Sequence, residues 1–523
     1  MKRTFFIAVL LICLSVSTAL HAVEVSERKD IAIFGLSAGS LYVPMEVLTY
    51  AESSISNEFI DLKRFNVLGY ENYRLEAGDV EEFIDRVREL QAEKAKEAGT
   101  YDEKFGTVVI KGEDFDRIVG SVLIVVPSVA EYRETRMQVP IVTEDIIYYI
   151  LNYNVNLAID LTFINVRTGT REESLRISGS GQNQDMRRAA SEAVESAVSN
   201  LGLRLKQIET FKIKSGVVRV QGDRVFFELG SDIGVQAGHE YEVLTKQEIG
   251  STGRITQIPT GLVRVRTVYP ELSEAQIVYR KERITEGDQL VEVAKLGMGF
   301  VIYSGAMQVD IPEMKYDIII QDDDYPTTTT DNYFIDFDQP AKDWVPFLGM
   351  SGEFGLGYRF QGLVDLQAFP TGSLWGFLGE FGVGSRFFRR RFGLQLKALV
   401  GLLYMTSFAQ ELGRVGTADH LDIGGERIDY NQDPTMTIDK FSFGVKGGAA
   451  LNYRIGRGSS LRLGVNYRVY TPIEDWSITI EETSGSSKSS VDITSDVDNI
   501  AGEGLKRASV SGLDFIGGVT ILF

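Results

Sequence analysis

Apolar and polar residues alternate with two different periods along this chain, and the change falls near residue 295. Before it, short apolar runs are followed by stretches with apolar residues at helical spacing, a pattern typical of strands joined to amphipathic helices. After it, glycine and aromatic residues become frequent and apolar residues occupy alternate positions, which predicts strands with one apolar face. We therefore expect a multidomain chain whose final part is all-β.

The region before residue 294 predicts two domains. An α/β domain is expected over 29–209, and short strands with Gly-Asp turns predict a small all-β barrel over 213–293. In the α/β domain, apolar runs predict strands at 31–34, 65–68, 121–126 (ended by Pro127) and 155–163, with a return strand after Thr168-Gly169. Apolar residues at helical spacing predict helices over 47–59, 80–90 and 190–205.

The segment 296–523 predicts an antiparallel transmembrane β-barrel of about eight strands. Six runs alternate clearly and two are weaker: 354–360, 375–387, 392–404, 441–455, 461–469 and 513–523, then 297–308 and 362–369. Tight turns are expected at 360–362, 388–391 and 456–459, and long, polar, irregular loops at 311–345, 409–439 and 472–510. Apolar residues outside and polar residues inside are what lipid on one side of a sheet requires. A soluble β-sandwich is the alternative, because its strands also alternate.

The polar positions of these runs predict a charged barrel interior. An eight-stranded barrel leaves room inside for little more than side chains, so opposite charges there should pair and fill the lumen. The barrel would then be an anchor without a diffusion pore. The expected interior network is Glu353, Arg359, Glu380, Arg386, Lys397, Lys446, Arg454, Arg462 and Arg468.

Both ends of the chain carry targeting patterns. Lys2 and Arg3, an apolar run and small residues before Ala22 predict a secretory signal peptide over 1–22. The C-terminal residue is aromatic, and apolar residues precede it at alternate positions. This pattern resembles the terminal strand that the barrel-assembly machinery of the outer membrane recognises, with Phe515, Val519, Ile521 and Phe523 as its apolar positions.

The composition argues against several chemistries. The single cysteine, Cys13, lies in the predicted signal peptide, so the mature chain has no disulfide or thiolate site. His239 and His420 stand alone, without metal-ligand or nucleophile–base spacing. The net charge of -19 opposes binding to nucleic acid. We expect no catalytic residue, no metal and no cofactor.

Four smaller features have competing interpretations. Gly179-Ser180-Gly181 suggests a phosphate-binding loop, but the Rossmann spacing is absent and a plain turn is favoured. Asp322-Asp323-Asp324 could bind calcium, but a solvated loop is favoured. Arg389-Arg390-Arg391 could contact anionic lipid headgroups or cap a periplasmic turn, and both interpretations stay open. His239 is expected on the surface of the small barrel, and His420 in a loop.

Three resemblances follow from these motifs. The sequence VNLAIDLTFINVRTGTREESLRISGSGQ, with the alanine-rich segment after it, resembles the superfamily of the TolB N-terminal domain and the curli-secretion lipoprotein (CsgG-like). GVQAGHEYEV and GDQL in the small barrel are similar to the FlgT C-terminal domain and related SH3-like modules. The final region resembles OmpA-like barrels. The first resemblance implies a periplasmic assembly factor.

These features predict a protein of the outer membrane of a diderm bacterium, with its N-terminal domains in the periplasm. We expect an interaction or assembly protein whose partners are outer-membrane lipid, the barrel-assembly machinery during biogenesis, and an unknown periplasmic or envelope protein. A small channel or transporter is one alternative, and single-channel conductance would distinguish it. A surface adhesin acting through the long loops is another.

Overall fold

The computed structural model describes residues 23–522 except for 40, 77, 94–101, 106, 143–146, 250–253, 296, 312–313, 322–329, 338–340, 372–373, 409, 412–419, 424–425, 430–433, 457, 475, 483–487 and 494–506. The predicted signal peptide lies outside the described residues. The chain divides into two compact units, with the main boundary between Ala294 and Lys295. Each unit is described by itself.

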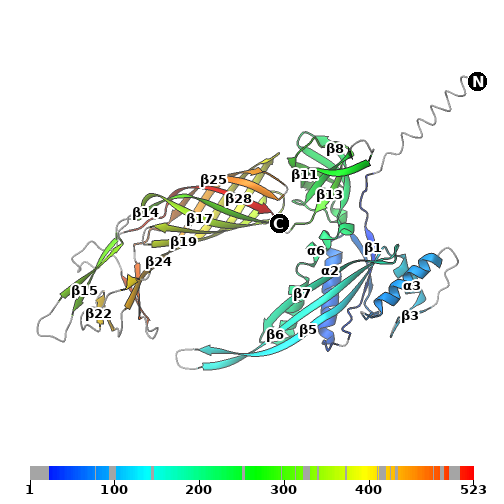
Figure 1. Ribbon diagram of the computed structural model, residues 1–523, viewed down its shortest axis with the longest axis horizontal. Coiled ribbons are helices and arrows are strands. Elements are labelled where there is room, and N and C mark those ends of the chain that lie inside the picture. Colours follow the sequence, from blue (N-terminus) through cyan, green and yellow to red (C-terminus); the bar gives the residue numbers. More distant parts are fainter. Residues whose placement is uncertain are drawn as a thin grey trace, which may run out of the picture. The chain divides into compact units, whose positions relative to one another are not determined.

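The first unit begins with an α/β domain built on a five-stranded sheet of order β2-β1-β5-β6-β7 (Figure 1). The first three strands in this order are parallel, and β5, β6 and β7 are antiparallel. The strands are β1 (Lys29–Phe34), β2 (Phe65–Tyr70), β5 (Leu123–Val142), β6 (Ile147–Asn165) and β7 (Thr170–Asn183), with a separate hairpin of β3 (Glu103–Phe105) and β4 (Val108–Ile110). The helices are α2 (Met45–Asp61), α3 (Val80–Glu93), α4 (Gly112–Gly120), α5 (Met186–Val198) and α6 (Leu201–Gln207), followed by the 3-10 turn η1 (Glu209–Phe211).

Helices cover both faces of this sheet, and the alternation within β1 shows how. Ile31 and Ile33 belong to a core cluster shared with α2, α5 and α6. Ala32 and Phe34 belong to a second cluster, shared with α3 and α4. Successive side chains of a strand point to opposite faces, so one short apolar strand contributes to both cores.

The glycines of Gly179-Ser180-Gly181 lie in β7 and have a packing role. A Cβ at Gly181 would overlap the Ala189 carbonyl oxygen, and one at Gly179 would overlap the Ala193 carbonyl oxygen. Helix α5 presents a buried alanine face to them, with Ala189, Ala190, Ala193 and Ala197. These glycines therefore allow α5 to pack directly on the backbone of β7, and the plain turn expected there is wrong.

The sequence suggested that Pro127 ends a strand, but in the structure it does not. Strand β5 continues through it to Val142, with a bulge between Val129 and Glu131, and pairs with β6 along its whole length. A proline is tolerated there because β1 pairs regularly with β5 only over Leu123–Val125, which leaves the Pro127 nitrogen without a ladder partner to lose. Figure 1 shows β5 and β6 continuing as a two-stranded hairpin beyond the helices.

The second part of this unit is a small closed barrel of strand order β10-β11-β12-β9-β8-β13. Val225, Phe227, Tyr241, Val243 and Leu290 are fully buried in it. Its strands are β8 (Lys214–Gln221), β9 (Arg224–Glu228), β10 (Glu240–Ile249), β11 (Arg254–Val268), β12 (Leu272–Arg280) and β13 (Gln289–Val293), with the 3-10 turn η2 (Ser231–Ile233) after β9. The family resemblances of this barrel and of the α/β domain stay predictions.

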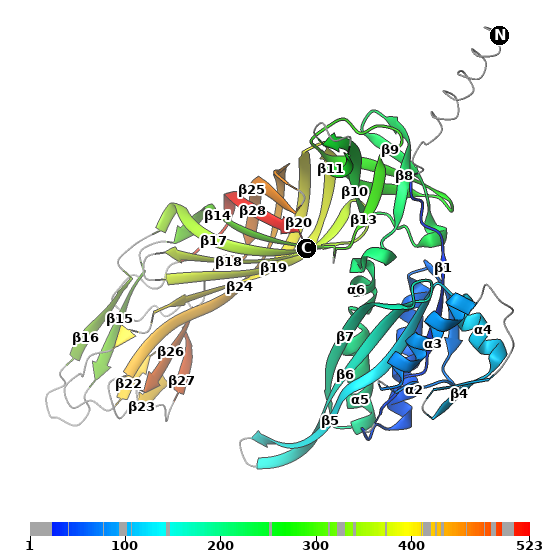
Figure 2. The same cartoon turned by 45° about the vertical axis from the view of Figure 1, so that its right-hand side comes forward.

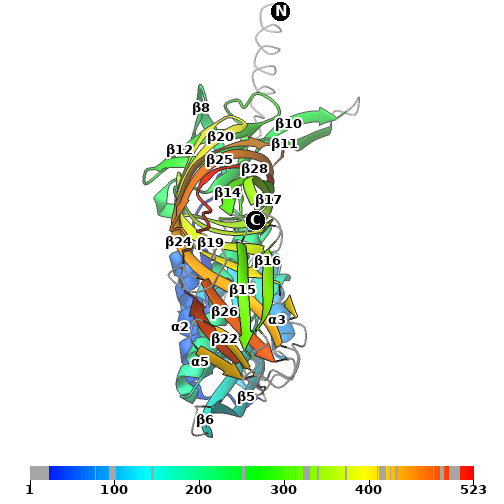
Figure 3. The ribbon, with the colours of Figure 1, turned by 90° about the vertical axis from the view of Figure 1, so that its left-hand side faces the viewer.

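The second unit contains a closed antiparallel barrel of eight strands, as the sequence predicted (Figure 3). The pairing of β14 with β28 and of β20 with β24 completes the ring. The strands are β14 (Met298–Ile311), β17 (Ala341–Gly355), β18 (Phe360–Thr371), β19 (Leu374–Arg389), β20 (Phe392–Ser407), β24 (Pro434–Arg454), β25 (Ser459–Tyr470) and β28 (Gly512–Leu522). Among the described residues, no helix is long and apolar enough to cross a membrane.

Two expectations about this barrel were wrong in detail. The second strand was expected at 354–360, but β17 ends at Gly355 and the turn to β18 follows it. The long loops were expected to be irregular, but they contain strands at the end of the barrel away from the tight turns (Figure 2). These strands are β15 (Met314–Gln321), β16 (Thr330–Phe337), β21 (Gln410–Glu411), β22 (His420–Ile423), β23 (Glu426–Asp429), β26 (Trp476–Glu482) and β27 (Lys488–Ile493).

We expect Gly181→Ala to destabilise the α/β domain by about 1–3 kcal/mol, because the added Cβ has no room against the α5 backbone. Helix ellipticity at 222 nm reports this domain, since the described α-helices precede Lys212. The three tryptophans, Trp344, Trp375 and Trp476, report the large barrel. Urea should remove the helix signal of the variant at a lower concentration while tryptophan fluorescence is unchanged. Gly78→Ala is the control, because a Cβ there meets nothing within 4 Å; equal midpoints for both variants would contradict the packing role.

Candidate functional site: the large barrel

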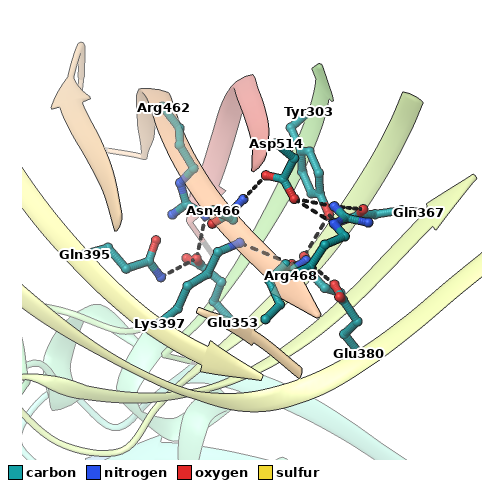
Figure 4. A network of polar contacts seen from close by, with 12 residues as sticks. Tyr303, Glu353, Gln367, Glu380, Gln395, Lys397, Arg462, Asn466, Arg468 and Asp514 are labelled. Atoms are coloured by element: carbon teal, nitrogen blue, oxygen red, sulfur yellow. Dashed lines mark hydrogen bonds and ion pairs between the residues drawn. The ribbon is translucent and has the colours of Figure 1, made fainter. Parts of the chain in front are cut away.

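The interior of the large barrel holds paired charges, and the first cluster surrounds Glu353 of β17 (Figure 4). Its carboxylate accepts from Arg462 Nη1 at 2.7 Å and from Gln395 Nε2 at 3.0 Å, and it also pairs with Arg386. The Glu353 side chain is almost fully buried. Three strands besides β17 therefore supply donors to one carboxylate.

The second cluster is centred on Lys446 of β24, whose side chain is fully buried. Its Nζ lies 3.0 Å from Asp365 Oδ2 and also pairs with Glu380. Lys397 Nζ lies 3.3 Å from the same Asp365 oxygen, and the Tyr470 hydroxyl donates to Glu380 Oε1 at 2.9 Å. Two carboxylates thus face two lysines.

The third cluster joins the second through uncharged side chains. Arg468, also fully buried, pairs with Asp514, and its Nη2 donates to Gln367 Oε1 at 3.0 Å. Gln367 Nε2 donates to the Tyr303 hydroxyl, and that hydroxyl donates to Asp365 Oδ1, each at 3.0 Å. A continuous polar network therefore crosses the barrel interior, as Figure 4 shows.

The structure brings most of the expected interior residues together. The residues that take part in the three clusters are Glu353, Glu380, Arg386, Lys397, Lys446, Arg462 and Arg468. Arg454 is buried near the turn end and donates to the Gly456 carbonyl oxygen. Arg359 is the exception: it is exposed on the β17–β18 turn, because β17 ends four residues before it.

Two central carboxylates were missing from the expected network, Asp365 and Asp514. Asp514 alternates with the apolar Leu513 and Phe515 in the last strand, which is a usable signal in the sequence. Asp365 lies in β18, where Leu363 faces inward and weakens the pattern. The amide and hydroxyl members, Gln367, Gln395 and Tyr303, carry no charge and gave no signal.

At the loop end the interior is apolar, which the sequence pattern did not predict. Inward-facing residues of the ring are almost fully buried there: Met307, Val309, Ile311, Phe347, Phe369, Leu374, Met405 and Ile438. Ile473 and Trp476, in the connection that follows β25, are buried as well. Strands with apolar side chains on the inside pack like the core of a soluble barrel. The barrel interior thus contains a charged network and, at the loop end, an apolar layer, both made of buried side chains.

The outer surface is apolar around the whole ring. Each of the eight strands contributes exposed large apolar side chains, and Phe443 keeps 69% of its side-chain surface exposed. The band contains Ile302, Leu348, Met350, Phe354, Phe360, Val364, Leu366, Phe377, Phe381, Val383, Phe387, Phe392, Leu394, Leu396, Val400, Leu402, Phe441, Phe443, Val445, Leu451, Tyr453, Leu461, Leu463, Val465, Tyr467, Val469, Leu513, Phe515, Val519 and Ile521. An apolar patch on this scale is not left in water by soluble proteins. This is the surface of a transmembrane β-barrel.

Comparisons with known proteins return outer-membrane barrels at low similarity. A major outer membrane protein from Thermus thermophilus is 11% identical, with 43% of this chain and 99% of that chain covered and a TM-score of 0.25. Neisserial surface protein A is 12% identical, with 43% of this chain and 99% of that chain covered and a TM-score of 0.19. OprG from Pseudomonas aeruginosa is 13% identical, with 44% of this chain and 97% of that chain covered and a TM-score of 0.17. No family model and no curated protein matches the chain. Similarities this low do not establish a shared function.

The terminal strand places its apolar positions on the outer face. Phe515, Val519 and Ile521 of β28 are exposed, while Asp514 and Thr520 point inward and are buried. Phe523 lies outside the described residues. The lipid-facing side of the last strand is thus the side that carries the expected assembly signal.

The other candidates from the sequence give no ligand site in the described part of the chain. Asp322-Asp323-Asp324 lies outside the described residues. Within those residues, no group of three or more histidine, cysteine or acidic side chains could hold a metal ion. His420 begins β22 and is not in an irregular loop.

A buried ion pair joins the α/β domain to the small barrel inside the first unit. Arg64, just before β2, makes two hydrogen bonds to the Glu292 carboxylate of β13, at 2.7 and 3.0 Å. Arg64 also donates to the Phe211 carbonyl oxygen, and the Ile213 amide donates to Glu292. Burial alone would raise the pKa of Glu292, but Arg64 and the Ile213 amide lower it below its usual range.

His239 lies beside this pair and is half-buried, where a surface position had been expected. Burial lowers its pKa to about 4, and the positive charges of Lys206 and Arg64 add to this effect against the opposing charge of Glu292. Its Nδ1 accepts from the Gln236 amide at 3.3 Å, which only the unprotonated nitrogen can do. His239 is therefore neutral in the folded protein at neutral pH.

We expect Arg468→Met to destabilise the barrel by about 3–5 kcal/mol, because it leaves the buried Asp514 carboxylate without its cation. The folded barrel should convert to the unfolded, slower-migrating form at a lower temperature in unheated-versus-heated gel electrophoresis. The double variant Arg468→Met/Asp514→Leu should recover much of the loss. Arg359→Gln is the control, since that guanidinium is exposed, and an equal shift in both would contradict the buried network.

Lowering the pH from about 7 to about 5 should weaken the first unit through His239. In the unfolded chain His239 has a pKa of about 6.5, and in the folded protein its pKa is about 4. Between these two values the unfolded state is protonated and the folded state is not, so lowering the pH favours unfolding. Stability contributed by His239 is thus present above about 6.5 and is lost as the pH falls toward about 4. The urea midpoint of the 222 nm signal should drop, and less so in His239→Gln. A variant with the full wild-type pH dependence would show that another group titrates.

Proposed function

We propose that this chain is an outer-membrane protein whose barrel is an anchor and whose N-terminal unit binds a periplasmic or envelope partner. One observation carries the proposal: the barrel is apolar outside and filled by compensated charges inside. Lys446 and Arg468 have fully buried side chains in the interior. A water-filled pore would instead keep interior charges in contact with solvent.

The topology supports placing residues 23–294 on the periplasmic side. Strand β14 begins at the same end of the barrel at which β28 finishes, since Gly299 pairs with Leu522. The tight turns lie at this end, and in outer-membrane barrels short turns face the periplasm and long loops face outward. The chain therefore passes from the N-terminal unit into β14 on the periplasmic side.

The β5–β6 hairpin supports a binding role for this unit. Strand β6 pairs with β7 only from Tyr153 onward, so its first residues pair with β5 alone. Tyr149 keeps 65% of its side-chain surface exposed, and Met137 and Leu151 are exposed as well. Strand edges with unpaired backbone groups and apolar side chains are suited to pairing with another chain. No catalytic step forms part of this proposal.

The loop end favours one alternative, a surface adhesin. Strand β24 continues beyond the ring, where Pro434–Asp439 pairs with β26 and β26 pairs with β27. Such strands provide a structured surface outside the bilayer. The channel alternative has no comparable support, and a stable, sizeable single-channel conductance of the purified protein would favour it.

Photo-crosslinking in intact cells tests the proposal. A photoreactive residue at Tyr149 should give a covalent adduct with an envelope protein, and one at Val109, an exposed apolar position on β4, should give much less. Mass spectrometry then identifies the partner. Recovery of the protein in the soluble fraction would overturn the anchor, and membrane-integrated protein without adducts from Met137, Tyr149 and Leu151 would overturn the binding role of the hairpin.

A further inference from the structure

We propose that the turn end of the barrel binds the phosphate groups of anionic phospholipids through exposed arginines. This inference rests on the proposed membrane anchor. It concerns three arginines, Arg359, Arg389 and Arg390, which are exposed on the β17–β18 and β19–β20 turns. We call them the rim arginines.

Charge is distributed unevenly between the two ends of the barrel. The segments around the three tight turns, 354–362, 386–394 and 453–461, contain seven arginines and no acidic residue. Two of the seven do not add to the surface charge, because Arg386 pairs with Glu353 inside the barrel and Arg454 is buried. The three long connections, 312–340, 409–433 and 471–511, contain 22 acidic residues and six lysines or arginines. In a chain of net charge -19, the turn end is a local basic surface that favours an anionic ligand.

The rim arginines stand next to the lipid-facing band. Phe387 precedes Arg389 by two residues and Phe392 follows Arg390 by two, and both rings are exposed. Phe392 also packs on Tyr453, with ring centroids 5.2 Å apart. Aromatic rings of this kind lie at the boundary between hydrocarbon and headgroups, so adjacent guanidinium groups lie at the depth of lipid phosphates.

Arg359 is held at this boundary by two rings. Its guanidinium carbon lies 5.7 Å from the Tyr358 ring centroid and 5.2 Å from the Phe387 ring centroid. Stacking on aromatic faces leaves the guanidinium edge able to donate in the plane, and that edge matches two phosphate oxygens. Arg391 is only partly exposed and is not included in the site.

The ligand is an anionic phospholipid, because the apolar band next to the arginines contacts acyl chains. A free phosphate ion would use the same donors but gain nothing from the band. Each basic residue close to an anionic membrane surface strengthens binding by about fivefold. The three rim arginines together should therefore produce a measurable preference for phosphatidylglycerol over phosphatidylcholine.

The experiment uses full-length protein in mixed micelles of phosphatidylglycerol and phosphatidylcholine, with bound lipids counted by native mass spectrometry. The wild-type protein should prefer phosphatidylglycerol, and Arg359→Gln/Arg389→Gln/Arg390→Gln should lose about fivefold of this preference per arginine. The matched control, Arg171→Gln/Arg187→Gln/Arg188→Gln, removes the same charge from exposed positions of the α/β domain and should keep it. Retention of the heat-modifiable form shows that each variant folds.

Three results would overturn the inference: no preference in the wild type, equal losses in both triple variants, or complete displacement of phosphatidylglycerol by inorganic phosphate. The last would identify a free-phosphate site. Failure of the anchor is distinguishable, because the wild-type protein would then be removed from phosphatidylcholine vesicles by an alkaline wash. Protein that resists the wash without a lipid preference contradicts the rim site alone.

Discussion

The second unit depends on compensation of charged and polar groups inside a closed ring. Moving an ion out of water costs several kcal/mol even after relaxation, and only close partners offset this cost. Asp365 meets that requirement with Lys397, Lys446 and Tyr303, and Glu353 with Arg386, Arg462 and Gln395. The backbone meets the same requirement by closing the ring at β14–β28 and β20–β24, since lipid offers no hydrogen bonds. The barrel can therefore present apolar side chains to lipid, because the charged side chains of these clusters point inward and pair with charged side chains of other strands.

Buried charges inside the barrel favour function at its two ends. If the barrel is an anchor, as proposed, binding takes place at the turn end, the loop end or the N-terminal unit, because Lys446 and Arg468 have fully buried side chains inside the barrel. Within that unit, the Arg64–Glu292 pair is buried and links the segment before β2 to β13. Removing one partner of such a pair is strongly destabilising, because it leaves the other charge buried and uncompensated.

The sequence predicts those features of the barrel that depend on local patterns of apolar and polar residues. Alternation with period two identified the barrel, the number of its strands and the outward side of β28, because lipid imposes a uniform apolar face. The alternation misplaced side chains where the chain turns and where the barrel interior is apolar, because contact with lipid does not determine the pattern there. Arg359 followed Tyr358 in apparent alternation, but the chain was already turning there. Met307 and Phe347 face inward because the loop end packs as a soluble core. Pairing partners such as Asp365 with Lys446 are 81 residues apart, and no local pattern contains that information. The glycines of β7 were visible as residues, but their role required the position of α5.

The charge asymmetry of the barrel would give the proposed orientation a physical basis. Carrying charged side chains through hydrocarbon is costly, so 22 acidic residues in the long connections, once across the bilayer, oppose return. Arginine opposes translocation in the same way, and it also gains from phosphate at the headgroup level, which acidic residues do not. The rim arginines would therefore hold the turn end at the periplasmic leaflet while the acidic loops remain outside. In this proposal, the same arginines that bind lipid would also fix the side of the membrane on which the N-terminal unit works, because β14 begins and β28 ends at the turn end of the barrel.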